Sequence, residues 1–266
     1  MKITVMTDME GVAGVVSFED QAFATGKYYE QAKRLLTGEV NAAVEGLAEA
    51  GADDILVIDG HGDGGIVYEE LHPAARLLHG RPFAPWRTTL DELTTGRDAA
   101  ILIGQHAMAG TLDGNLHHTM SSQTVEYYKL NGKEVGETAL FVLYQGALGV
   151  PLVFLSGDAA ACREVEELVP GVVTAAVKQG LTRTCAVSLP VEASRKLIRQ
   201  GVQKALRAHA RRPIAPLKWP GPYVLEKRFL SPEPADWAMQ GDVGAERVDE
   251  LTVRYRSEDI CSVLYA

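Results

Sequence analysis

Cysteine is scarce in this sequence. Its 266 residues include three cysteines, Cys162, Cys185 and Cys261, which are odd in number and widely spaced. Such a set indicates neither a disulfide framework nor a cysteine-based zinc knuckle, and it is typical of a protein in a reducing cytoplasm. We therefore expect a cytoplasmic protein that folds around a hydrophobic core, for which 266 residues are sufficient.

Positive charge is in the minority. The chain has 26 lysines and arginines against 35 acidic residues, which gives a formal net charge of −9. This balance argues against nucleic acid or an anionic membrane as the main partner. It favours a cationic group on the substrate instead.

The sequence also lacks a pattern typical of a membrane protein. Acidic residues follow the short apolar run at the N-terminus at once, so we expect no signal peptide. One uncharged segment, from Thr138 to Gly157, is interrupted by Gly149 and Pro151. This interruption predicts a buried helix followed by a buried strand rather than a membrane span.

Strand and helix patterns alternate in the first part of the chain. The continuous apolar strands are typical of a parallel sheet covered on both faces, and Asn131-Gly132 predicts a tight hairpin turn. The expected helices carry apolar residues at spacings of three and four. The predicted strands are Lys2–Thr7, Ile55–Ile58, Ala99–Gly104 and, as the last core strand, Leu152–Leu155; the predicted helices are Tyr28–Ala50, Glu137–Leu148 and Ala159–Leu168.

The pattern changes after Pro170. A long amphipathic helix, Val191 to Ala210, precedes a proline-rich segment and strands near Tyr223–Leu230 and Leu251–Tyr255. We therefore predict an α/β fold, a mostly parallel sheet flanked by helices, with a smaller C-terminal α+β portion. Residues 1–171 would form a metal-binding catalytic domain, and residues 172–266 a smaller domain for which oligomerisation is one role.

Polar residues of one chemical kind follow three of the predicted strands. Asp8 and Glu10 follow the first strand, His61 lies in DGHGDGG after the second, and His106 lies in GQH after the third. In parallel α/β sheets, ligands bind at the carboxyl ends of the strands. Residues two apart on a strand share a face, so the two carboxylates can point to one place. We expect all four side chains to meet at one edge of the sheet.

Two carboxylates and two imidazoles suit zinc, with manganese or cobalt as alternatives. Glu137 is a fifth candidate ligand, because an ionised glutamate at the start of an uncharged helix needs a partner. Three acids and two histidines exceed what one catalytic zinc needs, which indicates two metals bridged by a carboxylate such as Asp8. Asp59 and Asp63 are expected to form turns rather than to bind metal.

A histidine pair, His117 and His118, lies in the segment LHHTM. Adjacent side chains on an extended segment point in opposite directions, so at most one of the two faces the site. A histidine beside a metal, but not bound to it, can move a proton or stabilise an oxyanion.

These motifs together resemble a known family. TDMEG, DGH, GQHA, the H-x-M of HHTM and the VGE that ends at Glu137 occur in the order of the dinuclear-zinc D-aminopeptidase family (DppA type), and the resemblance extends to about residue 185. It implies metal ligands at Asp8, Glu10, His61, His106 and Glu137, with two zinc ions per subunit. His118 is the implied catalytic histidine, because a methionine follows it two residues later.

The resemblance also implies an activity and an assembly. The activity is release of an N-terminal D-amino acid, such as D-alanine, from short peptides with a free amino terminus. A metal-activated water would attack, and His118 would stabilise the oxyanion or carry the proton. The assembly is a ring-shaped homo-oligomer, decameric in the type member.

Two other functions fit parts of the pattern. A dinuclear metallophosphoesterase also uses acids and histidines at strand ends, but it favours Asp-x-His where this chain has Asp8-Met9-Glu10. A non-enzymatic, metal-containing ligand-binding protein is the second alternative, and it would need no proton-transfer residue such as His118.

Overall fold

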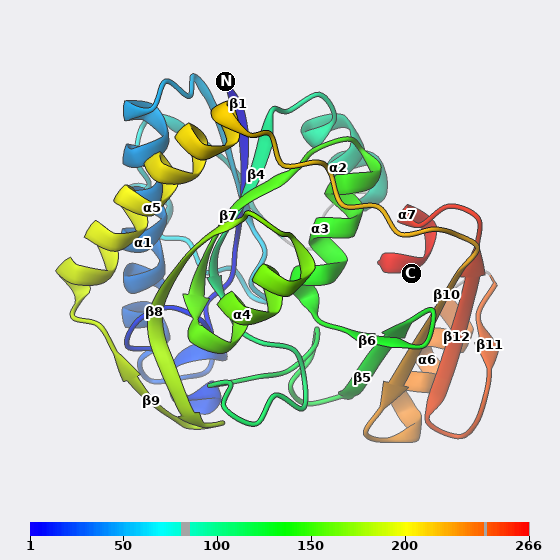
Figure 1. The fold of residues 1–266 in the computed structure, drawn as a ribbon. Helices are drawn as coiled ribbons and strands as arrows, with labels where there is room; N and C mark the ends of the chain where they lie inside the picture. Colours follow the sequence, from blue (N-terminus) through cyan, green and yellow to red (C-terminus); the bar gives the residue numbers. More distant parts are fainter. Residues whose placement is uncertain (81–85, 242–243, 266) are drawn as a thin grey trace.

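The computed structural model describes residues 1–80, 86–241 and 244–265 of the protein, and the strands among these residues form two sheets (Figure 1). In the larger sheet all neighbours are parallel except the last pair. Its order is β3 (Ala75–Leu78), β2 (Asp54–Asp59), β1 (Lys2–Thr7), β4 (Ala99–Gln105), β7 (Leu152–Asp158), β8 (Val173–Thr182) and β9 (Cys185–Ser188).

Helices cover both faces of this sheet. Alternation along β1 sends Ile3 and Val5 to one face and Met6 to the other, where each joins a separate apolar core. The first face is covered by α1 (Tyr29–Glu49) and α5 (Val191–Arg211), and the second by α2 (Trp86–Thr94), α3 (Glu137–Ala147) and α4 (Ala159–Leu168).

The smaller sheet is antiparallel and lies beside α3 (Figure 1). Its order is β11 (Glu246–Arg247), β12 (Thr252–Ser257), β10 (Tyr223–Phe229), β5 (Val125–Leu130) and β6 (Lys133–Val135), and α6 (Pro232–Gly241) and α7 (Cys261–Leu264) pack against it. The predicted hairpin turn is confirmed, because Asn131 and Gly132 both have positive φ. Two short helices, η1 (Phe18–Ala22) and η2 (Tyr68–Glu70), lie in the loops that follow β1 and β2.

The predicted fold class is confirmed, with one correction. Leu152–Leu155 is not the last core strand, because β8 pairs in parallel with β7. The residues of β8 include Lys178 and alternate less regularly between buried and exposed positions, so they lack the continuous apolar run of the other core strands. Each sheet also contains strands from both sides of residue 171, which is the domain boundary predicted from the sequence.

The uncharged segment after residue 137 forms a helix and then a strand, as predicted. The helix α3 ends at Ala147, Gly149 adopts a φ of 83°, and β7 begins at Leu152. None of the described helices is both long enough and apolar enough to cross a membrane.

We predict opposite effects for two glycines of α1. A Cβ at Gly46 would lie 2.7 Å from the backbone oxygen of Arg199 in α5, whereas a Cβ at Gly38 would meet the guanidinium end of Arg195. A guanidinium group can move aside and a backbone cannot. Gly46→Ala should therefore lower the free energy of unfolding in urea by about 1–2 kcal/mol despite the better helix propensity of alanine.

Gly38→Ala is the matched control and should be neutral or more stable by up to about 1 kcal/mol. Equal losses in the two variants would contradict this account of how α1 packs against α5.

Candidate metal centre

The loop after β1 crosses the end of β4 in close backbone contact. Asp8 N–H donates to Ile103 O and Gly11 N–H donates to Gly104 O, each at 2.8 Å. A Cβ at Gly11 would meet the backbone oxygen of Gln105, and Gly104 has a φ of 79°. Glycine at these positions therefore allows the loop to lie against the sheet edge, which holds Asp8 and Glu10 in place.

Asp8 and Glu10 meet His61, which comes from the loop after β2. The Nδ1 atom of His61 lies 3.3 Å from Asp8 Oδ1 and 3.3 Å from Glu10 Oε2. On the other side of the ring, Nε2–H donates to the backbone oxygen of Ala22 at 2.8 Å. All three side chains are buried.

The second oxygen of Asp8 faces His106, which follows β4. His106 Nε2 lies 3.1 Å from Asp8 Oδ2 and 3.3 Å from Glu137 Oε1, while its Nδ1–H donates to Ala107 O at 2.9 Å. Glu137 is the first residue of α3 and is partly exposed. The structure thus brings together all five side chains that the sequence marked as candidate ligands.

His118 completes the cluster. Its ring stacks on that of His106 with centroids 3.9 Å apart, and its Nε2 lies 3.7 Å from Glu137 Oε1. His118 Nδ1–H donates to Leu116 O at 2.9 Å. His117 points into its own loop instead, where its Nδ1 accepts from Gly110 N–H at 3.2 Å. The geometry therefore brings His118, rather than His117, to the candidate ligands.

The three histidines of the cluster share one arrangement. Each donates one ring N–H to a backbone carbonyl and directs its other nitrogen toward carboxylates. Such a hydrogen bond fixes the tautomer and leaves the inner nitrogen with a lone pair, as in histidines that bind metals. Lone pairs of nitrogen and oxygen only 3.1–3.3 Å apart repel unless a proton or a cation lies between them.

Two buried atoms of the cluster, Glu10 Oε2 and His106 Nε2, have no hydrogen-bond partner. Ligand atoms of Asp8, Glu10 and His106 lie within 4.8 Å of one another, as do those of His106, His118 and Glu137. Carboxylate and imidazole donors at such distances fit one or two transition-metal ions.

Burial and the attraction between neighbouring charges shift the pKa values of this cluster in opposite directions. Burial raises the pKa of Asp8, but the imidazoles of His106 and His61 beside it hold that pKa well below its usual range. Burial lowers the pKa of both imidazoles, but the charges of Glu10 beside His61 and of Glu137 beside His106 raise it well above the usual value. Metal binding at these nitrogens therefore competes with protons, so it should weaken as the pH falls.

Comparison with known proteins identifies the family. A family model described as D-aminopeptidase, Peptidase_M55, matches residues 1–266. The chain belongs to this family. A curated D-aminopeptidase of Bacillus subtilis (strain 168) is 31% identical over 270 residues, which cover 100% of this chain and 95% of the relative.

A solved structure is also similar to this member of the D-aminopeptidase family. It is described as the Zn-dependent D-aminopeptidase DppA from Bacillus subtilis, a self-compartmentalizing protease, and it matches with a TM-score of 0.88 and 29% identity over 100% of this chain and 94% of that chain. The resemblance seen in the sequence and the predicted enzyme class, a metallo-aminopeptidase, are confirmed. The comparisons favour neither a phosphoesterase nor a non-enzymatic binding protein.

Two buried charged residues that hold the site loops of this D-aminopeptidase-family chain were missed in the sequence. The ammonium group of Lys178, on β8, donates to the backbone oxygens of Glu10 and Val15. Asp158, at the end of β7, accepts from Asn115 N–H at 2.7 Å and from Gly180 N–H at 3.1 Å. The sequence does contain a signal for each: Asp158 is an acid at the end of a fourth strand, and Lys178 is a lysine inside a strand.

Burial lowers the pKa of Lys178 to about 8, and the charges of Asp158, Glu10 and Glu39 limit the fall. The two residues pair across β7 and β8. Lys178 thus holds the loop that carries Glu10, and Asp158 holds the loop that carries His118.

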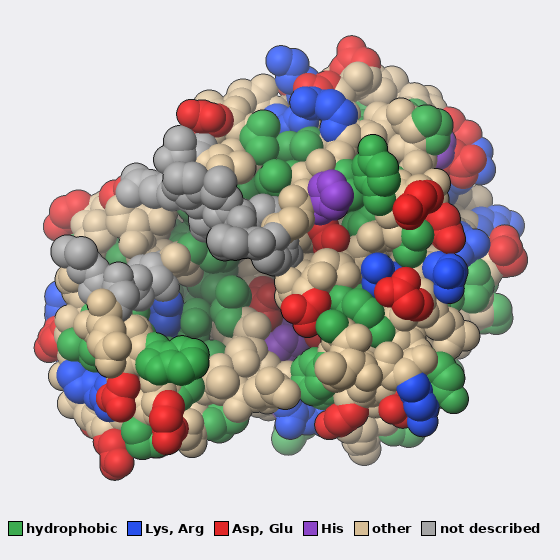
Figure 2. Space-filling model, turned by 180° about the vertical axis from the view of Figure 1, so that it is seen from behind, with side chains coloured by type: hydrophobic (Ala, Val, Ile, Leu, Met, Phe, Trp, Pro, Cys, Tyr) green, Lys and Arg blue, Asp and Glu red, His purple; other side chains and the backbone are tan. Residues whose placement is uncertain are grey.

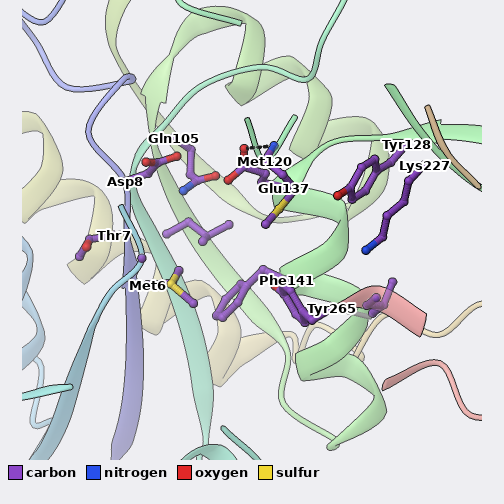
Figure 3. A pocket seen from close by; sticks show the side chains of 13 residues that line it. Met6, Thr7, Asp8, Gln105, Met120, Tyr128, Glu137, Phe141, Lys227 and Tyr265 are labelled. Carbon is purple, nitrogen blue, oxygen red and sulfur yellow. Dashed lines mark hydrogen bonds between the residues drawn. The ribbon is translucent and has the colours of Figure 1, made fainter. Parts of the chain in front are cut away.

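Two cavities adjoin the cluster, and Asp8, Gly60, Met120 and Glu137 line both. One has a volume of about 360 Å³ and mostly apolar walls, and the other a volume of about 270 Å³ and walls that are polar and apolar in about equal parts. Figure 2 shows a hollow lined by hydrophobic side chains with acidic and histidine side chains beside it. Met120 lies between the cavities with a φ of 63°, and its N–H donates to Glu137 Oε1 at 2.6 Å (Figure 3).

We predict that Asp158→Asn lowers kcat by about tenfold or more while bound metal is retained. One carboxylate oxygen becomes an amide nitrogen, which repels a backbone N–H and displaces the loop of His118, and small displacements of a catalytic group are costly. Turnover and metal content, measured on the same preparation, check this.

Asn115→Ala is the control, because it keeps the backbone N–H that Asp158 binds and should lower kcat less. An unchanged kcat in Asp158→Asn, with reduced stability alone, would mean that Asp158 has only a structural role.

Proposed function

We propose that this chain is a zinc-dependent aminopeptidase that releases N-terminal D-amino acids, such as D-alanine, from short peptides. The observation that carries the proposal is the convergence of three carboxylates on two imidazole nitrogens at 3.1–3.3 Å, with His118 beside them. The Zn-dependent D-aminopeptidase with a TM-score of 0.88 supports the metal and the substrate class.

In this proposal five side chains would hold two zinc ions. Asp8 presents Oδ1 toward His61 and Oδ2 toward His106, so it can bridge two half-sites. Glu10 and His61 would complete one half-site, and His106 and Glu137 the other. Bound zinc supplies Lewis acidity, which lowers the pKa of a water and polarises the scissile carbonyl.

The chain's own residues would orient the substrate and move the proton. The metal site that these residues hold would bind the free amino group of a peptide. His118 keeps Nδ1–H on Leu116 O, so its Nε2 is the atom that faces the reacting groups. A proton on Nε2 can stabilise the oxyanion or pass to the leaving amine.

The proposal extends to assembly and location. The self-compartmentalizing solved relative supports a homo-oligomer, and a ring such as a decamer would place the sites inside a closed space. Residues 172–266 are the part that we assign to oligomerisation. A cytoplasmic location accords with the three cysteines, none of which forms a disulfide among the residues that the structure describes.

His118→Ala should leave the zinc content intact and lower turnover by roughly 10²-fold or more, because a group that moves a proton or stabilises an oxyanion is removed. Metal analysis and steady-state kinetics on the same preparation measure both effects.

His117→Ala is the matched control, since that ring is bonded within its own loop, and it should keep most of the activity. Loss of zinc together with activity in His118→Ala would make His118 a ligand. An unaffected rate would remove it from the mechanism.

The substrate class is tested with zinc present and three peptides: D-Ala-D-Ala, L-Ala-L-Ala and N-acetyl-D-Ala-D-Ala. We expect cleavage of the first only, because acetylation removes the basic amino group that the metal site would bind. Equal or faster cleavage of the L-dipeptide, or cleavage of the acetylated peptide, would contradict the D-aminopeptidase proposal while leaving a metallohydrolase.

A further inference from the structure

A single π-helical turn, η1, lies in the loop that follows β1. It is closed by a hydrogen bond that spans five residues, from Phe23 N–H to Phe18 O at 2.9 Å. Turns of this kind are rare and are frequent at functional sites. The last residue of the turn, Ala22, supplies the backbone oxygen that binds His61 Nε2–H. The turn therefore supports one histidine of the metal centre.

The first residue of the same turn, Phe18, contacts a second histidine of the site. Its side chain is buried, and its ring lies 5.4 Å from that of His118 between centroids, with an angle of 82° between the two planes. The ring of His106, by contrast, makes an angle of 15° with that of His118. His118 thus contacts one ring that is nearly parallel to its own and one that is nearly perpendicular.

These contacts limit how the imidazole of His118 can turn. The torsion that rotates a histidine ring has broad preferences, so the bond itself does not select one orientation. The hydrogen bond from Nδ1–H to Leu116 O at 2.9 Å fixes one ring atom, about which the rest of the ring could still pivot. Perpendicular aromatic pairs are favourable. The ring of Phe18 therefore opposes the rotation that the hydrogen bond alone would allow.

The hairpin between β8 and β9 joins the turn to the segment that carries His118. The guanidinium carbon of Arg183 lies 5.3 Å from the centroid of the Phe18 ring, and the backbone oxygen of Arg183 accepts from Leu116 N–H at 2.7 Å. Leu116 has a φ of 53°, a conformation that leucine adopts only where its surroundings hold it. One residue of the hairpin thus contacts both supports of the His118 ring.

We propose that Phe18 is a positioning residue for His118, whose ring it holds in the orientation in which Nε2 faces the reacting groups. This inference rests on the proposed aminopeptidase function, in which that nitrogen moves a proton or stabilises an oxyanion. Small displacements of such a group lower the rate strongly. Phe18 is not among the described residues that line either cavity, so it acts through His118 rather than on the substrate.

The first test is Phe18→Leu in the zinc-loaded full-length protein, with D-Ala-D-Ala as the substrate. Leucine keeps a large apolar side chain but removes the flat ring. We expect kcat to fall about tenfold while KM and zinc content change little, because the orientation of His118 affects the transition state more than the binding of substrate or metal.

Phe229→Leu is the matched control. Phe229 is 7% exposed, against 6% for Phe18, but it lies on β10 and is not among the described residues that line the cavities. The same change of side chain should lower the stability of the protein and leave kcat close to the wild-type value.

A double-mutant cycle separates positioning from general support of the fold. In the His118→Ala background, Phe18→Leu should have no further effect on kcat, because the ring that Phe18 orients is absent. The free energy of unfolding of the metal-free protein gives a second measurement, which needs neither zinc nor substrate. The losses caused by the two substitutions should be less than additive, because either change alone removes the contact between the rings.

Three results would each overturn the inference. They are an unchanged kcat in Phe18→Leu, an equal fall in kcat with and without His118, and additive losses of stability in the metal-free protein. Failure of the wild-type protein to cleave D-Ala-D-Ala with zinc present would instead contradict the proposed function. The stability cycle would still test the contact between the rings, so the two failures are distinguishable.

Discussion

Three carboxylates that converge at one sheet edge are the constraint on which the rest of the site depends. Asp8, Glu10 and Glu137 would repel one another in a buried position unless positive charge lay between them. Imidazole nitrogens of His61 and His106 lie 3.1–3.3 Å from the carboxylate oxygens. The other ring nitrogen of each histidine donates a hydrogen bond to a backbone carbonyl. The three acids and the oriented histidines thus form one electrostatic unit.

The surrounding fold holds these side chains in position. Glycines at the ends of the central strands let the loop after β1 lie against β4. The buried residues Asp158 on β7 and Lys178 on β8 hold two loops of the site by hydrogen bonds. Few of these supports touch the reacting groups, but each limits where a carboxylate or an imidazole can move. Precision at a site of this kind comes from the rigidity of such supports.

Much of this arrangement could be predicted from strand ends. The apolar runs before Asp8, His61 and His106 placed three side chains at one sheet edge, and Asp59 forms a turn as expected by accepting from Gly65 N–H at 2.8 Å. Lys178 escaped prediction because its role depends on contacts with loops more than 160 residues away. Strand β8 could not be predicted because its residues do not form a continuous apolar run. The cavity could not be predicted because its walls come from segments that are distant in the sequence.

The second sheet also sets an order of completion during synthesis. All candidate ligands and His118 lie within the first 137 residues, whereas Lys227, which lines the apolar cavity, belongs to a strand that begins at Tyr223. The hairpin of β5 and β6 leaves the ribosome long before β10 can pair with it. A nascent chain can therefore present all of its candidate ligands before the strand that completes the wall of the apolar cavity has been made.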